Sequence, residues 1–181
     1  NLRLPPYHLE RKGDQYELTF EGAWPEVMLW EIPALAGLME LRGRAVLNDM
    51  GRFELQVLYA RAMTRLWEKI ERLRNLPELG IADFGTRRRH SFLWQDWGVQ
   101  AMIEGLGPKF TGTSNCLIAM RREVEAIGTN AHELPMVYAA LAKDDAALAQ
   151  APYDVLQDWH DEHEGNLRII LPDTYGTKGF L

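Results

Sequence analysis

The sequence predicts an α/β fold with a parallel sheet. From residue 79 onward, short apolar segments alternate with longer helical segments, and this alternation is typical of parallel sheets. Each of the four strands predicted in this region ends in a polar motif that contains glycine or threonine. In parallel sheets and in barrels of this kind, functional residues collect on the loops that follow the strands. We therefore expect a functional site at these strand ends.

The first 78 residues predict a strand and two helices. Side chains alternate between apolar and polar along 16–20, as in a strand. Trp24 then opens a helix that Pro33 should kink. A second helix, ended by Pro77, is predicted by one apolar stripe made of Leu55, Leu58, Ala62, Leu66, Ile70 and Leu73.

The remaining elements follow from the change of rhythm after residue 79. Short apolar runs bounded by glycine, threonine or proline predict strands, and longer runs between them predict helices. The predicted strands are 80–84, 109–113, 125–129 and 167–172. The predicted helices are 92–104, 114–124, 131–141 and 145–163, the last with a break at Pro152.

The composition is that of a globular protein with an acidic balance. The chain has 181 residues, of which 46% are hydrophobic, and 20 basic against 26 acidic residues give a net charge of −6. This charge disfavours a nucleic-acid-binding function. Cys116 is the single cysteine, so an internal disulfide is excluded and a reducing compartment is favoured. Because no apolar run has membrane-spanning length, we expect no membrane association and a cytoplasmic location.

The first strand-end motif carries three consecutive arginines, Arg87, Arg88 and Arg89. Guanidinium groups are planar and permanently charged, and they bind phosphate or carboxylate through two hydrogen bonds. Three neighbours cannot all point the same way, so one or two of them would face a site. The residues alone leave open whether this is an anion site or a solvated basic turn.

The second motif, Thr111 to Asn115, places small hydroxyl residues directly before a helix. Such residues cap helices, and the exposed N–H groups at a helix start can bind an anion. Both interpretations remain open for this motif.

The third motif, Gly128 to Glu133, places His132 at the start of a helix after a strand. Imidazole is suited to proton transfer or to a transient bond to phosphorus near neutral pH. A structural histidine is the alternative. In the fourth motif, Asp173 at a strand end suits either Mg²⁺ or sugar hydroxyls, or an ordinary turn.

Taken together and in order, these motifs resemble the signatures of a known enzyme family. The segments are FGTRRR (84–89), FTGTSN (110–115), GTNAHE (128–133) and DTYGT (173–177). They are similar to the strand-end signatures of the nicotinate phosphoribosyltransferase family, and 20–33 resembles the strand-to-helix entry of that family. The similarity runs over nearly the whole chain, and we expect it to cover the middle of a longer protein.

The resemblance implies a fold and a reaction. The fold is the irregular α/β barrel of a type II phosphoribosyltransferase, with 1–45 in an N-terminal α/β domain, 46–78 as a connecting helix and 79–181 as the first part of the barrel. The reaction is ATP-coupled, of ligase type, and joins nicotinate to 5-phosphoribosyl 1-diphosphate. Mg²⁺, a homodimer and a cytoplasmic location are expected, and the metal ligands are unknown.

The resemblance also implies roles for individual residues. His132 corresponds to the family's phosphorylated histidine, and Thr129 to a residue that contacts nicotinate. Arg87, with Arg88 beside it, corresponds to the arginine that clamps a substrate, and Asp173 to a residue near the phosphoribosyl donor or Mg²⁺.

Ser114 bears on the choice of substrate. Relatives that use nicotinamide carry an aspartate there, which would repel the carboxylate of nicotinate, whereas a serine hydroxyl can donate to that carboxylate. Two alternatives remain: a phosphoribosyltransferase for nicotinamide or quinolinate, and a non-catalytic phosphate- or nucleotide-binding domain.

Overall fold

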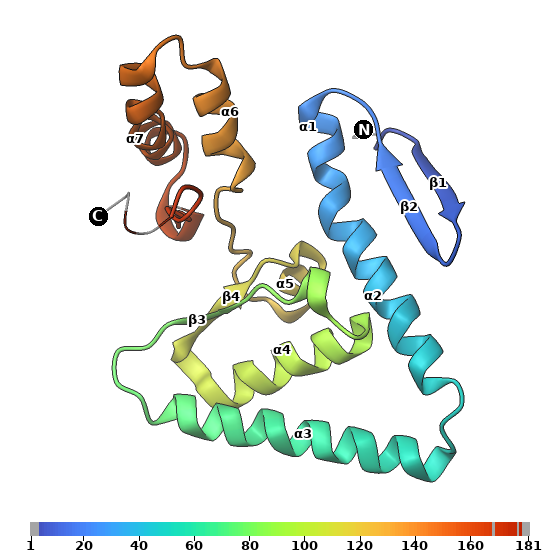
Figure 1. The fold of residues 1–181 in the computed structure, drawn as a ribbon. Helices are drawn as coiled ribbons and strands as arrows, with labels where there is room; N and C mark the ends of the chain where they lie inside the picture. The colour runs from blue at the N-terminus through green and yellow to red at the C-terminus, as the bar shows by residue number, and fades with distance from the viewer. Residues whose placement is uncertain (1–3, 168, 177, 179–181) are drawn as a thin grey trace. The chain divides into compact units, whose positions relative to one another are not determined.

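The structure is a computed structural model that describes residues 4–167, 169–176 and 178. It forms two compact units, the first ending at Glu125 and the second beginning at Ala126 (Figure 1). The predicted mixed α/β class is confirmed, but no closed barrel is visible among the described residues.

An antiparallel hairpin opens the first unit. Strand β1 (Tyr7–Lys12) pairs with strand β2 (Gln15–Phe20). The sequence predicted β2 but not β1. A two-residue turn joins them, and its first residue, Gly13, has φ of 66°. Glycine reaches this left-handed region without steric cost, which suits a tight hairpin turn.

A helical segment follows the hairpin and changes geometry once. Helix α1 (Trp24–Val27) passes into a 3-10 turn at Met28–Trp30, and helix α2 (Glu31–Leu47) continues from it. The ring of Pro33 would clash with the carbonyl four residues earlier, which lies within this turn. The kink predicted at Pro33 therefore appears as this 3-10 turn, just before α2 begins.

The core of the first unit lies between two long helices and a strand. Helix α3 (Arg52–Arg74) packs along helix α4 (Phe92–Leu106), as Figure 1 shows. Both helices were predicted, α3 from its single apolar stripe and α4 from the longer run that follows the first predicted strand. The buried cluster between them contains Ile70, Val99, Ala101, Leu106, Phe110 and Ile118.

Two parallel strands position the first two motifs. Strand β3 (Ile81–Asp83) pairs with strand β4 (Phe110–Thr113), as the sequence predicted. The helix predicted at 114–124 is shorter: helix α5 spans Cys116–Arg122. The side chain of Asn115 accepts a hydrogen bond from the N–H of Ile118 and so caps this helix, which explains the later start.

The second unit is built on two packed helices. Helix α6 (Glu133–Leu141) packs against helix α7 (Asp145–Glu162). The break predicted at Pro152 is wrong, because α7 continues through it. Pro152 lies beside Pro135 and Val155 around a small cavity, and this apolar packing compensates for the missing helix hydrogen bond. No helix within the described residues is long and apolar enough to cross a membrane.

The strands predicted at 125–129 and 167–172 do not form as strands in the described residues. A single parallel bridge between Thr129 and Ile169 joins the two segments. Arg168 lies outside the described residues, as does Thr177 of the fourth motif. This bridge has the parallel direction expected for the two predicted strands. Two paired strands alone are only marginally stable, which explains why neither segment forms a regular strand.

Candidate functional site

A half-buried carboxylate joins the first and second motifs in the first unit. Asp83, the last residue of β3, accepts three hydrogen bonds: from the N–H of Gly85 at 3.0 Å, from Nε2 of Gln95 at 2.7 Å and from Oγ1 of Thr113 at 2.8 Å. Gln95 and Thr113 are buried. Because the buried side chains of Gln95 and Thr113 both need hydrogen-bond partners, their bonds to Asp83 fix the two strand ends relative to each other.

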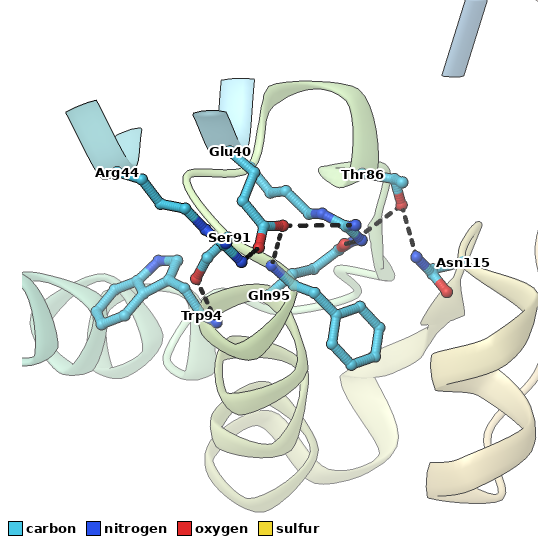
Figure 2. A network of polar contacts seen from close by, with 9 residues as sticks. Glu40, Arg44, Thr86, Ser91, Trp94, Gln95 and Asn115 are labelled. Atoms are coloured by element: carbon cyan, nitrogen blue, oxygen red, sulfur yellow. Dashed lines mark hydrogen bonds and ion pairs between the residues drawn. The ribbon is translucent and has the colours of Figure 1, made fainter. Parts of the chain in front are cut away.

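The network continues to the surface of the strand ends. The amide of Gln95 donates to Oγ1 of Thr86 at 3.0 Å, and the amide of Asn115 donates to the same oxygen at 3.1 Å. On the other side, Arg89 donates to Oε1 of Gln95 at 3.2 Å. Figure 2 shows the contacts that run from Gln95 through Thr86 to Asn115; Arg89 links Gln95 in turn to Glu40 of helix α2.

Glu40 fastens helix α2 to the segment that follows the arginines. Its carboxylate accepts from Arg44 at 2.8 Å and from the N–H of Phe92 at 3.1 Å, and it lies 4.0 Å from Arg89. The hydrogen bond from Arg44, with that from Phe92, holds the pKa of the Glu40 carboxyl below its ordinary value. The N-terminal helix is thereby tied to the first motif.

The three arginines of the first motif have different surroundings. Arg89 is mostly buried between Gln95 and Glu40 and stacks over the ring of Phe92, so it holds the local structure. Arg88 is exposed. Arg87 lies on a 3-10 turn and forms an ion pair with Glu31, the first residue of α2. Of the three, Arg87 is thus the half-exposed arginine whose ion pair is with a single half-exposed carboxylate, that of Glu31.

Ser114 is held at the strand ends through its backbone. Its N–H donates to the carbonyl oxygen of Asp83 at 2.8 Å, which continues the pairing of β3 with β4 by one residue. Its side chain is half-buried. Since the backbone bond does not depend on the side chain, the hydroxyl of Ser114 can serve another purpose.

In the second unit, Asn130 holds the third and fourth motifs together. It is 1% exposed, and its Oδ1 accepts from the N–H of Leu171 at 2.7 Å. Oγ1 of the neighbouring Thr129 donates to the carbonyl oxygen of Asn130 at 3.0 Å. Tyr175 also donates to the carbonyl oxygen of Pro135 at 3.0 Å. These bonds bring two motifs that are distant in the sequence to the same place.

The two titratable residues of these motifs form a pair. Nε2 of His132 lies 3.0 Å from Oδ1 of Asp173, and both side chains are exposed. His132 is the residue before α6 and lies outside the helix proper, not in its first turn as the sequence suggested. The hydrogen bond from His132 lowers the pKa of Asp173, so this carboxylate remains charged and orients the imidazole.

The described residues do not by themselves form a metal centre. No three histidine, cysteine, aspartate or glutamate side chains gather in this part of the chain. Asp83 has its oxygens occupied by protein donors, and Asp173 is one carboxylate engaged with His132. Mg²⁺ is commonly held by one or two carboxylates together with substrate phosphates. Asp173 fits such a site only as one ligand.

Four residues of these sites were not identified as site residues from the sequence: Glu31, Glu40, Asp83 and Gln95. Gln95 carries a local signal, since it is a polar residue among the apolar positions of α4. Glu31 and Glu40 act on residues more than fifty positions away, and no local pattern marks such contacts.

The sequence model of the nicotinate phosphoribosyltransferase (NAPRTase) family matches residues 79–181, which is more than half of the chain. The chain belongs to the nicotinate phosphoribosyltransferase family. This confirms the resemblance drawn from the four motifs, all of which lie within the matched range.

Solved structures of this family support the assignment. A Saccharomyces cerevisiae protein, assigned as a nicotinate phosphoribosyltransferase, is 27% identical with a TM-score of 0.72, over 97% of this chain and 42% of that one. The Vibrio cholerae nicotinate phosphoribosyltransferase is 28% identical with a TM-score of 0.62, and the match covers 83% of this chain and 36% of that one. The Porphyromonas gingivalis enzyme, 24% identical, agrees in fold with a TM-score of 0.73 over 96% and 42%. The chain thus spans 42% of the length of the Saccharomyces cerevisiae and Porphyromonas gingivalis proteins and 36% of the Vibrio cholerae protein.

Proposed function

We propose that the chain is the part of a nicotinate phosphoribosyltransferase that carries its phosphorylatable histidine and its substrate anion site. The reaction would transfer a phosphoribosyl group from 5-phosphoribosyl 1-diphosphate to nicotinate, with ATP hydrolysis, to give nicotinate mononucleotide for NAD salvage. The observation that carries this proposal is the pair of His132 and Asp173, since family membership alone leaves the catalytic competence of the residues open.

The pair suits transfer of phosphate from ATP. When Nε2–H of His132 donates to Asp173, the lone pair of the ring lies on Nδ1, which is therefore the nucleophile. Nδ1 would form a bond to the γ-phosphorus while the bond to the β-phosphate oxygen breaks, releasing ADP. Hydrolysis of the P–N bond then returns histidine and releases phosphate. The carboxylate of Asp173 stabilises the positive charge that the ring acquires.

The transfer to nicotinate needs positioning more than covalent catalysis. The pyridine nitrogen of nicotinate forms a bond to C1 of the ribose while the bond from C1 to the diphosphate oxygen breaks. The transition state resembles an oxocarbenium ion, so the protein places the reactants and neutralises the diphosphate. We assign the anions of the substrate or the donor, the carboxylate of nicotinate among them, to Arg87 with Arg88 nearby. We assign Ser114 and Thr129 to further contacts at the carboxylate end of nicotinate.

We propose that β3 and β4 are two strands of an irregular α/β barrel, with Asp173 near the phosphoribosyl donor or Mg²⁺. Within the first unit, the parallel pairing of β3 with β4 supports the assignment of these two strands. Within the second unit, the bridge between Thr129 and Ile169 is also parallel, as barrel strands are. A cytoplasmic homodimer is the assembly that we propose for the whole protein.

The decisive experiment is labelling with ATP that carries radioactive phosphorus in the γ position. We expect the protein to incorporate a phosphate that is stable to alkali and labile to acid, as a phosphohistidine is, and His132→Asn to abolish it. Label that persists in His132→Asn would remove His132 from this role.

A second histidine provides the matched control. His160 lies 3.2 Å from Asp161, so it is also an exposed histidine beside an aspartate. His160→Asn should be labelled as the unmodified protein is. Loss of label in both variants would indicate a general effect on the second unit rather than a specific role of His132.

A further inference from the structure

The ion pair of Arg87 with Glu31 joins a helix of the N-terminal region to the first strand-end motif. Glu31 begins α2, and its backbone is held because the preceding Trp30 donates from its indole N–H to the carbonyl oxygen of Pro5 at 2.8 Å and stacks on Phe20. The start of α2 is therefore held in place, and the side chain of Glu31 reaches Arg87 from there.

The pair is accessible enough to open. The side chain of Arg87 is 37% exposed and that of Glu31 is 39% exposed, in contrast to 16% for Arg89. Arg89 is also held by Gln95, whereas the side-chain contact of Arg87 is with Glu31. Exposed ion pairs are weak because water and salt compete for both charges.

A carboxylate or phosphate that binds Arg87 must compete with Glu31. The planar guanidinium donates hydrogen bonds to a carboxylate in the same geometry whether that carboxylate belongs to a side chain or to a ligand. The carboxylate of nicotinate and that of Glu31 are chemically equivalent for this purpose. The apparent affinity for the ligand is then the intrinsic affinity multiplied by the fraction of molecules in which Arg87 is not paired with Glu31.

We propose that Glu31 is the internal counter-ion of the anion site at Arg87, displaced by the carboxylate or phosphate of the substrate, and that it thereby sets the affinity of this site. This inference rests on the proposed function, which makes Arg87 a substrate-binding residue. It adds a second residue, from a different part of the chain, that determines how strongly anions bind.

The test is the binding of nicotinate to the 181-residue chain, followed by nuclear magnetic resonance at millimolar ligand. Glu31→Gln removes the competing charge and keeps the shape of the side chain, so it should bind nicotinate roughly 3- to 10-fold more tightly. Arg87→Gln should abolish binding in both backgrounds. Nicotinamide, which lacks the carboxylate, should show no such gain.

A matched control removes the same charge elsewhere. Glu68 is exposed on α3, so Glu68→Gln removes one negative charge from the surface. This variant should bind nicotinate as the unmodified chain does. An equal gain in Glu68→Gln would mean that net charge alone is responsible, and the inference would then be wrong. The spectra also report whether each variant is folded.

The remaining outcomes separate this inference from the proposed function. Unchanged or weaker binding in Glu31→Gln, with loss in Arg87→Gln, overturns the counter-ion role but keeps Arg87 as the anion site. Undiminished binding in Arg87→Gln, or no binding by Glu31→Gln at millimolar nicotinate, overturns the inference together with the role of Arg87. The labelling of His132 is measured separately and does not depend on either result.

Discussion

The Nε2 atom of His132 lies 3.0 Å from Oδ1 of Asp173, although 41 positions separate the two residues in the sequence. They come from different motifs, and both belong to the second unit. The segments that carry them are joined by the hydrogen bond from the N–H of Leu171 to Asn130 and by the bridge between Thr129 and Ile169. The buried amide of Asn130 therefore helps to position the pair.

Asp173→Asn should lower the rate of His132 phosphorylation about 10-fold or more, because a partner carboxylate typically contributes this much by orienting the ring and raising its basicity. The measurement is the initial rate of γ-phosphate incorporation from ATP. Asp161→Asn, beside His160, is the control and should leave the rate unchanged. An Asp173→Asn protein labelled at the normal rate would show that Asp173 does not assist this step.

Local patterns in the sequence predicted the helices of the first unit well. The apolar stripe from Leu55 to Leu73 predicted a helix that the structure extends to Arg52–Arg74. The polar ends of β3 and β4 do meet, because parallel strands bring their carboxyl ends to one edge of a sheet. These features depend on periodicity and on strand direction, both of which a single sequence contains.

Features that depend on distant partners were not predicted. Strand β1 has no buried residue, so its partner β2 rather than an apolar pattern defines it. The pairing of Glu31 with Arg87 joins residues 56 positions apart. Pro152 was expected to break α7, yet its apolar neighbours keep the helix intact. In each case tertiary contacts outweigh the local preference of the chain.

Ser114→Asp should weaken the use of nicotinate. Its carboxylate would repel that of the substrate, so the KM for nicotinate should rise at least about 10-fold, as expected for two like charges brought together at a site. Ser114→Ala, which only removes a donor, should raise KM by a smaller factor. Both variants should fold, because the Ser114 N–H keeps its bond to Asp83. Steady-state kinetics with nicotinate and with nicotinamide are the measurement, and an unchanged KM in Ser114→Asp would contradict the role of Ser114.

Gly105→Ala should destabilise the first unit by about 1–3 kcal/mol. A Cβ atom at Gly105 would overlap Cγ2 of Ile70, which is buried where α3 packs against α4. Gly37→Ala is the matched variant, since Gly37 also lies in a helix but has no neighbouring atom within 4 Å of the added Cβ. Gly37→Ala should instead stabilise by about 0.5–1 kcal/mol, because alanine favours helix over glycine. Urea unfolding of both variants measures the difference, and equal effects would contradict the close packing at Gly105.

Asp96→Asn should destabilise the first unit at neutral pH but not in acid. Arg122 donates to Asp96 from Nε at 3.0 Å and from Nη2 at 2.6 Å, which joins α5 to α4. These bonds lower the pKa of Asp96 and raise that of Arg122. The pKa of Asp96 is lower in the folded chain than the value of about 3.9 expected in the unfolded chain. The ion pair of Asp96 with Arg122 therefore contributes its full stabilisation at pH values above this unfolded pKa.

As pH falls through the lowered pKa of folded Asp96, protonation of the carboxyl removes this contribution. The free energies of unfolding of the unmodified chain and of Asp96→Asn should differ by about 1 kcal/mol at pH ~7, begin to converge below pH ~4 and become equal below the pKa of folded Asp96. Asp49→Asn is the control, since its carboxylate accepts from the neutral amide of Asn48 at 3.3 Å. Urea unfolding at a series of pH values measures the difference. A constant difference at every pH would mean that the charge of Asp96 is not what joins α4 to α5.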